Sequence, residues 1–416
     1  MTAAYFSRIS SSNSYDRSLQ NISNRQGSLA ELQENLTSGK KVLRSSDDPT
    51  GAALAERALT RINRVTADQR ALESQRNAMA SAESTLGEVV DRLQDFRELV
   101  VQAGNGSYTN AERSIIGKQL TSLREHIVNL SNRNDSNGMP LFAGLGSAVQ
   151  PFAGPGALPN DYTYKGLPGQ NASTVNSIPY ALDGDSAFMF HASRDGIYNV
   201  KMSATTSASS GTVSISDPAL VNGSSYSIAI TATGAGSTAG TLSTTYSITG
   251  TDAAGAPLAP VSVTSPDYPS TSPLSITGMS GLSLSLTGTL AVGNTIAVTP
   301  KASIFSTLDD AIRDIGSSVN GGSASQAVKQ ALHGIDAGLN RVMAVRGQAG
   351  ELLNRADRIT ESNSKLNIEL ESNRSRAEDL DMVKGISDFQ NQQTGYQAAL
   401  QSYAQVQKLS LFDYIR

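Results

Sequence analysis

The stretch that decides the fold lies near the carboxyl end of the chain: Met382-Val-Lys-Gly-Ile-Ser-Asp-Phe-Gln-Asn-Gln-Gln-Thr-Gly-Tyr-Gln-Ala-Ala-Leu-Gln-Ser-Tyr-Ala-Gln-Val-Gln-Lys-Leu409. It contains no proline, and its larger apolar residues recur at steps of three, four and seven: Met382, Ile386, Phe389, Tyr396, Leu400, Tyr403, Val406 and Leu409. This spacing places them along one seam of a helix, as in a coiled coil. The remaining residues are mostly Gln, Asn, Ser and Ala. Because a narrow apolar seam on a polar helix cannot bury itself, the stretch predicts a partner.

A matching pattern near the amino end supplies one candidate partner. It begins at Tyr15, follows the same steps, and ends at Gly39, a typical helix C-cap. The predicted assembly seam combines both ends and comprises Tyr15, Leu19, Ile22, Leu29, Leu36, Ile386, Phe389, Tyr396, Leu400, Tyr403, Val406 and Leu409. Two such helices alone bury little apolar surface for the many residues they order. We therefore expect the terminal segments 1–45 and 374–416 to be disordered in the monomer and to fold among other copies.

A long helix is predicted after the first segment, because Asp47 or Asp48 followed by Pro49 is a helix-start signal. Its seam runs from Ala58 to Val100, and nine of its thirteen positions are apolar. The four polar positions have two interpretations, register-setting contacts or places where the seam meets solvent; they are Gln69, Arg76, Glu83 and Arg97. Thr109 or Asn110 then caps a second helix, whose seam is Ile116, Leu120, Leu123, Ile127 and Leu130. We assign 46–145 to a helical rod.

The composition changes over residues 146–301, where Gly, Ser, Thr, Ala and Pro dominate. Residues alternate with period two in four short runs, which predicts β-strands bounded by turns; the runs are Tyr226–Ile230, Tyr246–Ile248, Val261–Val263 and Leu282–Leu286. Disorder from low complexity is the competing interpretation. Helical spacing returns over 302–373, through Val328 to Ala356. The predicted fold is mainly α, with long N- and C-terminal helices packed as a coiled-coil rod and a β-rich domain inserted at its tip.

The totals restrict the possible functions. The 416 residues carry a net charge of −4, so no global field favours nucleic acid or lipid. Cysteine is absent and only three histidines occur, which predicts no metal, no cofactor and no enzyme. No apolar run is long enough for a membrane insertion, and no Sec-type signal peptide is recognisable at the start. Gly39-Lys40-Lys41 lacks the spacing of a phosphate loop, and the turn Asn132–Gly138 lacks the carboxylates of a calcium loop.

Both ends of the chain resemble one protein family. Leu32-Gln-Glu-Asn-Leu-Thr-Ser-Gly-Lys40 with Ser46-Asp-Asp-Pro49 is similar to the N-terminal motif of bacterial flagellins and flagellar hook-associated proteins, and Arg8-Ile9-Ser10 resembles their opening. Tyr396-Gln-Ala-Ala-Leu-Gln-Ser-Tyr403 and Leu409-Ser-Leu-Phe-Asp-Tyr-Ile415 resemble their C-terminal segment. The resemblance covers about residues 8–145 and 305–416. Leu141-Phe-Ala-Gly144 and the Leu411–Ile415 ending look more like the hook–filament junction member than the filament subunit.

The resemblance implies a non-enzymatic structural subunit of the bacterial flagellum, exported unfolded by the flagellar type III route and located outside the cell at the junction. It implies a ring of identical subunits, with the first hook-associated protein below, flagellin above, and an export chaperone on the C-terminal segment. Two alternatives stay open, a flagellin filament subunit and a surface adhesin that acts through the β-domain. An enzymatic β-domain is the least favoured, since that region holds one histidine and few carboxylates.

Overall fold

The computed structural model describes residues 11–156, 161–203, 208–318 and 321–414, and the side chains of 11–15, 321 and 406–414 lie outside the described part. The motif Arg8-Ile9-Ser10 therefore also lies outside it. The chain forms two compact units. The first comprises 1–70 and 360–416, and the second comprises 71–359.

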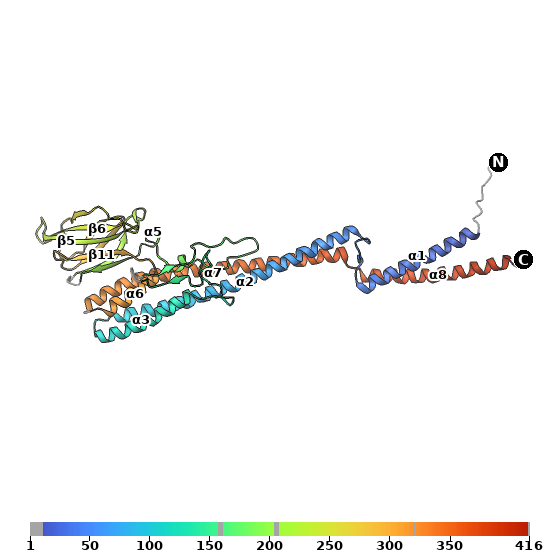
Figure 1. Cartoon of the computed structure of the whole chain (residues 1–416), viewed down its shortest axis with the longest axis horizontal. Helices are drawn as coiled ribbons and strands as arrows, with labels where there is room; N and C mark the ends of the chain where they lie inside the picture. Colours follow the sequence, from blue (N-terminus) through green and yellow to red (C-terminus); the bar gives the residue numbers. More distant parts are fainter. Residues whose placement is uncertain (1–10, 157–160, 204–207, 319–320, 415–416) are drawn as a thin grey trace, which may run out of the picture. The chain divides into compact units, whose positions relative to one another are not determined.

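Helices dominate both ends of the chain, and Figure 1 labels them in order. They are α1 (Ser11–Ser38), α2 (Pro49–Ala103), α3 (Asn110–Ser131), the short α4 (Gly184–Phe188) and α5 (Ala192–Asp195), α6 (Ile304–Gly316), α7 (Gly321–Glu378) and α8 (Met382–Tyr414). The predicted start signals are confirmed. The Asp48 carboxylate accepts the backbone N–H groups of Thr50 and Gly51, each at 3.0 Å, at the start of α2. Thr109 caps α3 and forms a capping box with Glu112.

In the second unit, α2, α3, α6 and α7 surround one apolar core. Leu86, Leu93 and Phe96 of α2 are fully buried in it, as are Ile335 and Val342 of α7. The predicted seams of α2 and α3 supply most of the core residues of these two helices. A seam that points at several helices at once has enough neighbours to exclude water, which the paired terminal helices lack.

The four polar seam positions of α2 all bond to α7, in a consistent antiparallel order. Within the first unit, Gln69 donates to Thr360 at 3.1 Å and accepts from Asn363 at 3.2 Å. Within the second unit, three ion pairs of 2.7–2.9 Å follow one another, namely Arg76–Asp357, Glu83–Arg346 and Arg97–Asp336. Of the two open interpretations, this pairing favours register-setting contacts.

The predicted 146–301 region contains two structurally different parts. Its first part is irregular, and with α4 and α5 it packs into the helical core rather than forming a separate one. It contains only a two-stranded ladder, β1 (Phe152–Ala153) with β2 (Thr163–Tyr164). Six aromatic rings gather there, with neighbouring centroids 4.9–5.6 Å apart; they belong to Phe142, Phe152, Tyr162, Tyr164, Phe188 and Phe305.

The second part is a β-sandwich with its own apolar core. Its six-stranded sheet has the order β3-β11-β5-β6-β7 with β8 beside β6, and its three-stranded sheet has the order β4-β10-β9. The strands are β3 (Tyr198–Met202), β4 (Ser209–Ile215), β5 (Ser225–Ala235), β6 (Thr241–Thr251), β7 (Val261–Thr264), β8 (Tyr268–Pro269), β9 (Leu274–Met279), β10 (Leu282–Thr287) and β11 (Thr295–Pro300). All described pairings are antiparallel. The four runs with period-two alternation all lie in strands, so those predictions are confirmed.

The predicted fold class is confirmed in its coarse form, long terminal helices around a central β-rich region. The coiled-coil rod, the position of the β-domain at its tip, and the domain boundaries remain predictions.

Candidate assembly surface

The helices α1 and α8 lie side by side and antiparallel in the first unit (Figure 1). Two glycines of α8 define the register. A Cβ on Gly385 would lie 3.2 Å from Cδ2 of Leu36, and a Cβ on Gly395 would lie 2.5 Å from Nη1 of Arg25. Residues later in α8 therefore face residues earlier in α1. The absence of side chains at these glycines lets Leu36 and Arg25 approach the backbone of α8 closely.

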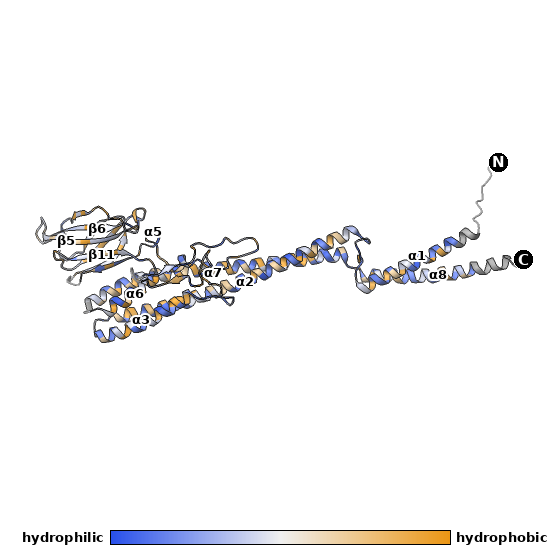
Figure 2. Ribbon diagram, viewed as in Figure 1, coloured by the Kyte–Doolittle hydropathy of each residue, from blue (hydrophilic) through white to orange (hydrophobic). Residues whose placement is uncertain are grey.

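The side of α8 that faces α1 consists largely of small or polar residues. Besides Gly385 and Gly395, the groove between the two helices is lined on the α8 side by Gln392, Ala399, Ser402 and Tyr403. On the α1 side it is lined by Ser18, Asn21, Ile22, Asn24, Arg25 and Ser28. Most of α8 is accordingly coloured pale or blue in Figure 2. Such a contact orders two helices while burying little apolar surface.

The predicted seam residues fall into three groups. Six are half-buried, namely Ile22, Leu29, Leu36, Phe389, Tyr396 and Tyr403. Three remain exposed beside the helix pair, with exposed fractions of 44% for Leu19, 47% for Ile386 and 41% for Leu400. Tyr15, Val406 and Leu409 lie in helical backbone, and their side chains are outside the described residues. Their roles in assembly remain predictions.

The apolar arc of α8 is therefore wider than the surface that α1 covers. On the uncovered edge, Met382 is 46% exposed, close to the values of Ile386 and Leu400. We call these three residues the open edge of α8. Leu32 of α1, which the sequence analysis left out of the seam, is half-buried, whereas Gln26 and Gln33 are exposed. Leu32 could have been found from its three-residue spacing to Leu29.

A short antiparallel bridge joins the two chain segments where both long helical stretches are interrupted. Lys40 pairs with Asp379 in this bridge, and the N–H of Lys41 donates to the carbonyl of Glu378 at 2.8 Å. The N–H of Leu380 donates to the carbonyl of Gly39 at 2.9 Å, and the Lys40 ammonium contacts the Glu378 carboxylate. Gly39 has φ of +72°, a left-handed conformation that glycine adopts without strain.

The Ser46-Asp-Asp-Pro49 motif shapes the chain just after this bridge. Asp47 accepts the N–H of Arg44 at 2.8 Å, and this hydrogen bond lowers the pKa of the Asp47 carboxyl despite slight desolvation. Hydrogen bonds from Gly51 and Thr50 likewise lower the pKa of Asp48. A Cβ on Gly51 would lie 3.2 Å from the carbonyl oxygen of Ala377 in α7, so the motif starts α2 close to the end of α7. Its carboxylates thus serve backbone geometry.

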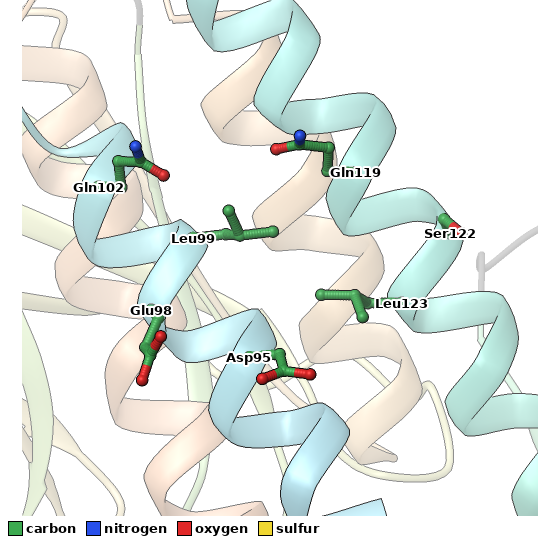
Figure 3. Close-up of a pocket in the computed structure, with 7 residues that line it drawn as sticks. All are labelled: Asp95, Glu98, Leu99, Gln102, Gln119, Ser122 and Leu123. Atoms are coloured by element: carbon green, nitrogen blue, oxygen red, sulfur yellow. The ribbon is translucent and has the colours of Figure 1, made fainter.

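A second groove lies between α2 and α3 in the other unit (Figure 3). Leu99 and Leu123 point into it from opposite helices, and polar residues surround them, namely Asp95, Glu98, Gln102, Gln119 and Ser122. Across the described ranges, no three His, Cys, Asp or Glu side chains gather in a way that could hold a metal ion. In the same part of the chain, no helix is long and apolar enough to cross a membrane.

Two protein-family models match the ends of the chain. The model described as the bacterial flagellin N-terminal helical region matches residues 9–147, and the model described as the C-terminal helical region matches 332–415. Together they span more than half of the 416 residues. They include α1, α2, α3, α8 and the greater part of α7, and they exclude the β-sandwich.

Individual proteins match in the same places. Flagellar hook-associated protein 3 of Salmonella typhimurium is 30% identical over 154 residues, which are 35% of this chain and 46% of that protein. Two crystal structures from Legionella pneumophila, described as flagellar hook associated protein-3 and as the flagellar junction protein FlgL, give TM-scores of 0.61 and 0.55. Each is 23% identical, and they cover 77% and 73% of this chain and 98% of their own. At that identity the likeness shows a shared fold, and the chain spans less than half of the length of the Salmonella relative.

Proposed function

We propose, from the premise that this chain belongs to the bacterial flagellin family, that it is a structural subunit of the flagellum at the junction between hook and filament. The names of its relatives, hook-associated protein 3 and flagellar junction protein, support this assignment. The proposed partners are further copies in a ring, the first hook-associated protein, flagellin, and an export chaperone on the C-terminal segment. The proposed location is outside the cell, after type III export.

One observation carries the proposal, the open edge of α8. Met382, Ile386 and Leu400 keep more than two fifths of their surface in water although α1 is paired with α8. Covering such a half-exposed side chain with a neighbouring subunit contributes about 1 kcal/mol. Three of them per subunit, repeated around a ring, favour assembly strongly while leaving a single chain soluble. Few charges oppose close packing, since between Met382 and Ala399 only Lys384 and Asp388 are charged.

The terminal helices are proposed to become fully ordered only in the assembly. Amide hydrogen exchange tests this on the free chain and on the polymer. In the free chain, we expect fast exchange across Leu19–Leu36 and Ile386–Leu400 beside slow exchange in the buried part of α2, which serves as an internal control. In the polymer, both terminal stretches should exchange slowly. Strong protection of the two stretches in the free chain would refute coupled folding and assembly.

Deleting the gene in the organism that carries it separates the junction role from that of a filament subunit. Without a junction subunit, cells should be non-motile, retain their hooks, and release flagellin monomers into the medium, because export continues while the filament has no attachment point. Without a filament subunit, the flagellin protein itself should disappear from the medium. Restoring the gene should restore motility. Hooks that still carry filaments after the deletion would exclude the junction role.

A further inference from the structure

The chain passes between the helical core and the β-sandwich at two adjacent places. It enters the sandwich through residues 190–198 and leaves it through 300–304, and backbone hydrogen bonds join the two passages. The N–H of Phe190 donates to Ala302 at 2.8 Å, and the N–H of Lys301 donates to Ile197 at 2.9 Å. Lys301 therefore has a fixed backbone at the root of the sandwich, directly before α6.

The side chain of Lys301 is only 9% exposed, and its amine contacts the carboxylate of Asp310 on α6. That carboxylate has two other partners. The Asn199 amide of β3 donates to it at 3.1 Å, and the Arg313 guanidinium contacts its second oxygen. Asp310 thus remains paired whether or not Lys301 carries a charge. The charge of Lys301 is the less well supported member of this cluster.

Every element packed around Lys301 can be assessed for charge. Helix α6 contributes Asp309, Asp310, Arg313 and Asp314, and the segment before β2 contributes Asp161. Asp309 is itself paired with Arg124 of α3 at 2.8 Å, and Asp161 accepts the hydroxyl of Ser303 at 3.1 Å. In the small cavity beside the amine, β3 contributes Tyr198, and α7 contributes only uncharged residues, namely Ala327, Gln330, Ala331 and Gly334.

Burial decides the protonation of this amine. It lowers the pKa of Lys301 to about 7, against the opposing effect of Asp314, and Arg313 lowers the pKa further. The three carboxylates Asp314, Asp161 and Asp309 do not restore the ordinary value. A lysine side chain in water keeps its proton up to about pH 10.4. The buried position and the solvent therefore favour different forms of the same side chain across the range between these two values.

We propose that Lys301 is a proton-controlled latch, whose neutral amine seats the β-sandwich on α6 and whose ammonium form favours a state with this contact opened to water. The seated state binds fewer protons than the opened state between about pH 7 and pH 10.4. Rising pH therefore favours the seated state, by up to about tenfold in the equilibrium ratio per pH unit. Below about pH 7 both states are protonated and the ratio becomes constant.

Other contacts oppose opening and belong to the same seam. The N–H of Ser210 in β4 donates to the Gln326 side chain of α7 at 3.1 Å, and the Gln330 amide donates to the carbonyl of Gly211 at 3.1 Å. These bonds involve no titratable group. They set how populated the opened state is, whereas Lys301 sets how that population depends on pH.

Double electron–electron resonance on the full chain measures the seam directly. The chain has no cysteine, so Ser122→Cys on α3 and Ser262→Cys on β7, both at exposed positions, carry spin labels at two sites alone. We expect a distance distribution with a second, broader component at pH 7.0 that shrinks at least tenfold relative to the main component by pH 9.5. Lys301→Met should show the main component alone at both pH values. An identical parent distribution at pH 7.0 and pH 9.5 would overturn the proposal.

Two further variants isolate the group responsible. Lys201→Met removes an exposed lysine from β3 of the same sandwich and should behave like the parent. His191 contacts Asp185 at 2.8 Å at the other passage, so His191→Gln tests whether that pair contributes; it too should behave like the parent. Urea unfolding provides a second measurement if labels perturb the seam: the unfolding constant of the parent should fall between pH 7 and pH 9.5 by more than that of Lys301→Met. An equal pH dependence in both would also overturn the proposal.

Discussion

Phe305→Ala is expected to destabilise the second unit by about 3–5 kcal/mol, the largest effect of any single truncation we predict. Phe305 is fully buried at the start of α6, and its ring lies 4.9–5.6 Å from those of Phe152, Tyr162 and Phe188. Removing the ring leaves a cavity among groups that belong to four separate chain segments. Those segments cannot all move inward, because each is also held by its own backbone bonds.

Chemical denaturation followed by far-ultraviolet circular dichroism measures this loss as a lower midpoint. Phe305→Leu, which refills most of the space, should cost less than about 1.5 kcal/mol. Val175→Ala is the matched surface control, since Val175 is 86% exposed, and it should change stability by less than about 0.5 kcal/mol. If Phe305→Ala unfolds at the same midpoint as Val175→Ala, the aromatic cluster does not stabilise the join between helices and sandwich.

The helical fold was predictable because its signals are periodic. The seam of α2 continues over many turns, and a run such as Leu86, Val90 and Leu93 has no other reasonable explanation. Even its polar interruptions, such as Arg76 and Arg97, occur at seam spacing and find partners on α7. The aromatic cluster could not be predicted in the same way. Phe142, Phe188 and Phe305 are far apart in the sequence, and no local pattern shows that their rings meet.

The α1–α8 contact marks the limit of seam reasoning. Large apolar residues define a seam in a sequence, but the face of α8 against α1 includes Gly385, Gly395 and Ala399, which produce no hydrophobic period. Which residues are covered depends on how closely two backbones approach, and small residues decide that. The same applies to Lys301. A single lysine after a nearly uncharged stretch gives no sign in the sequence that it is buried.

Ile386→Asp combined with Leu400→Asp is expected to abolish polymer formation and motility while leaving the second unit folded. The two residues lie fourteen positions apart, about four helical turns, so the variant places two carboxylates along the open edge of α8. Each carboxylate would be buried against a neighbouring subunit without a partner, at a cost of several kcal/mol per contact. In the single chain the same positions stay in water, so the monomer should lose little stability.

The matched control is Ser387→Asp combined with Ala398→Asp. These exposed residues lie eleven positions apart, about three turns, on a stripe of α8 away from both α1 and the open edge. The control adds the same charge to the same helix and should still assemble. Ultracentrifugal pelleting of purified chains, electron microscopy of the polymer and a swarming assay compare the two variants. Equal assembly in both would show that the open edge is not an interface. Equal failure would show that α8 tolerates no added charge on either side, so that the contact surface extends around the helix.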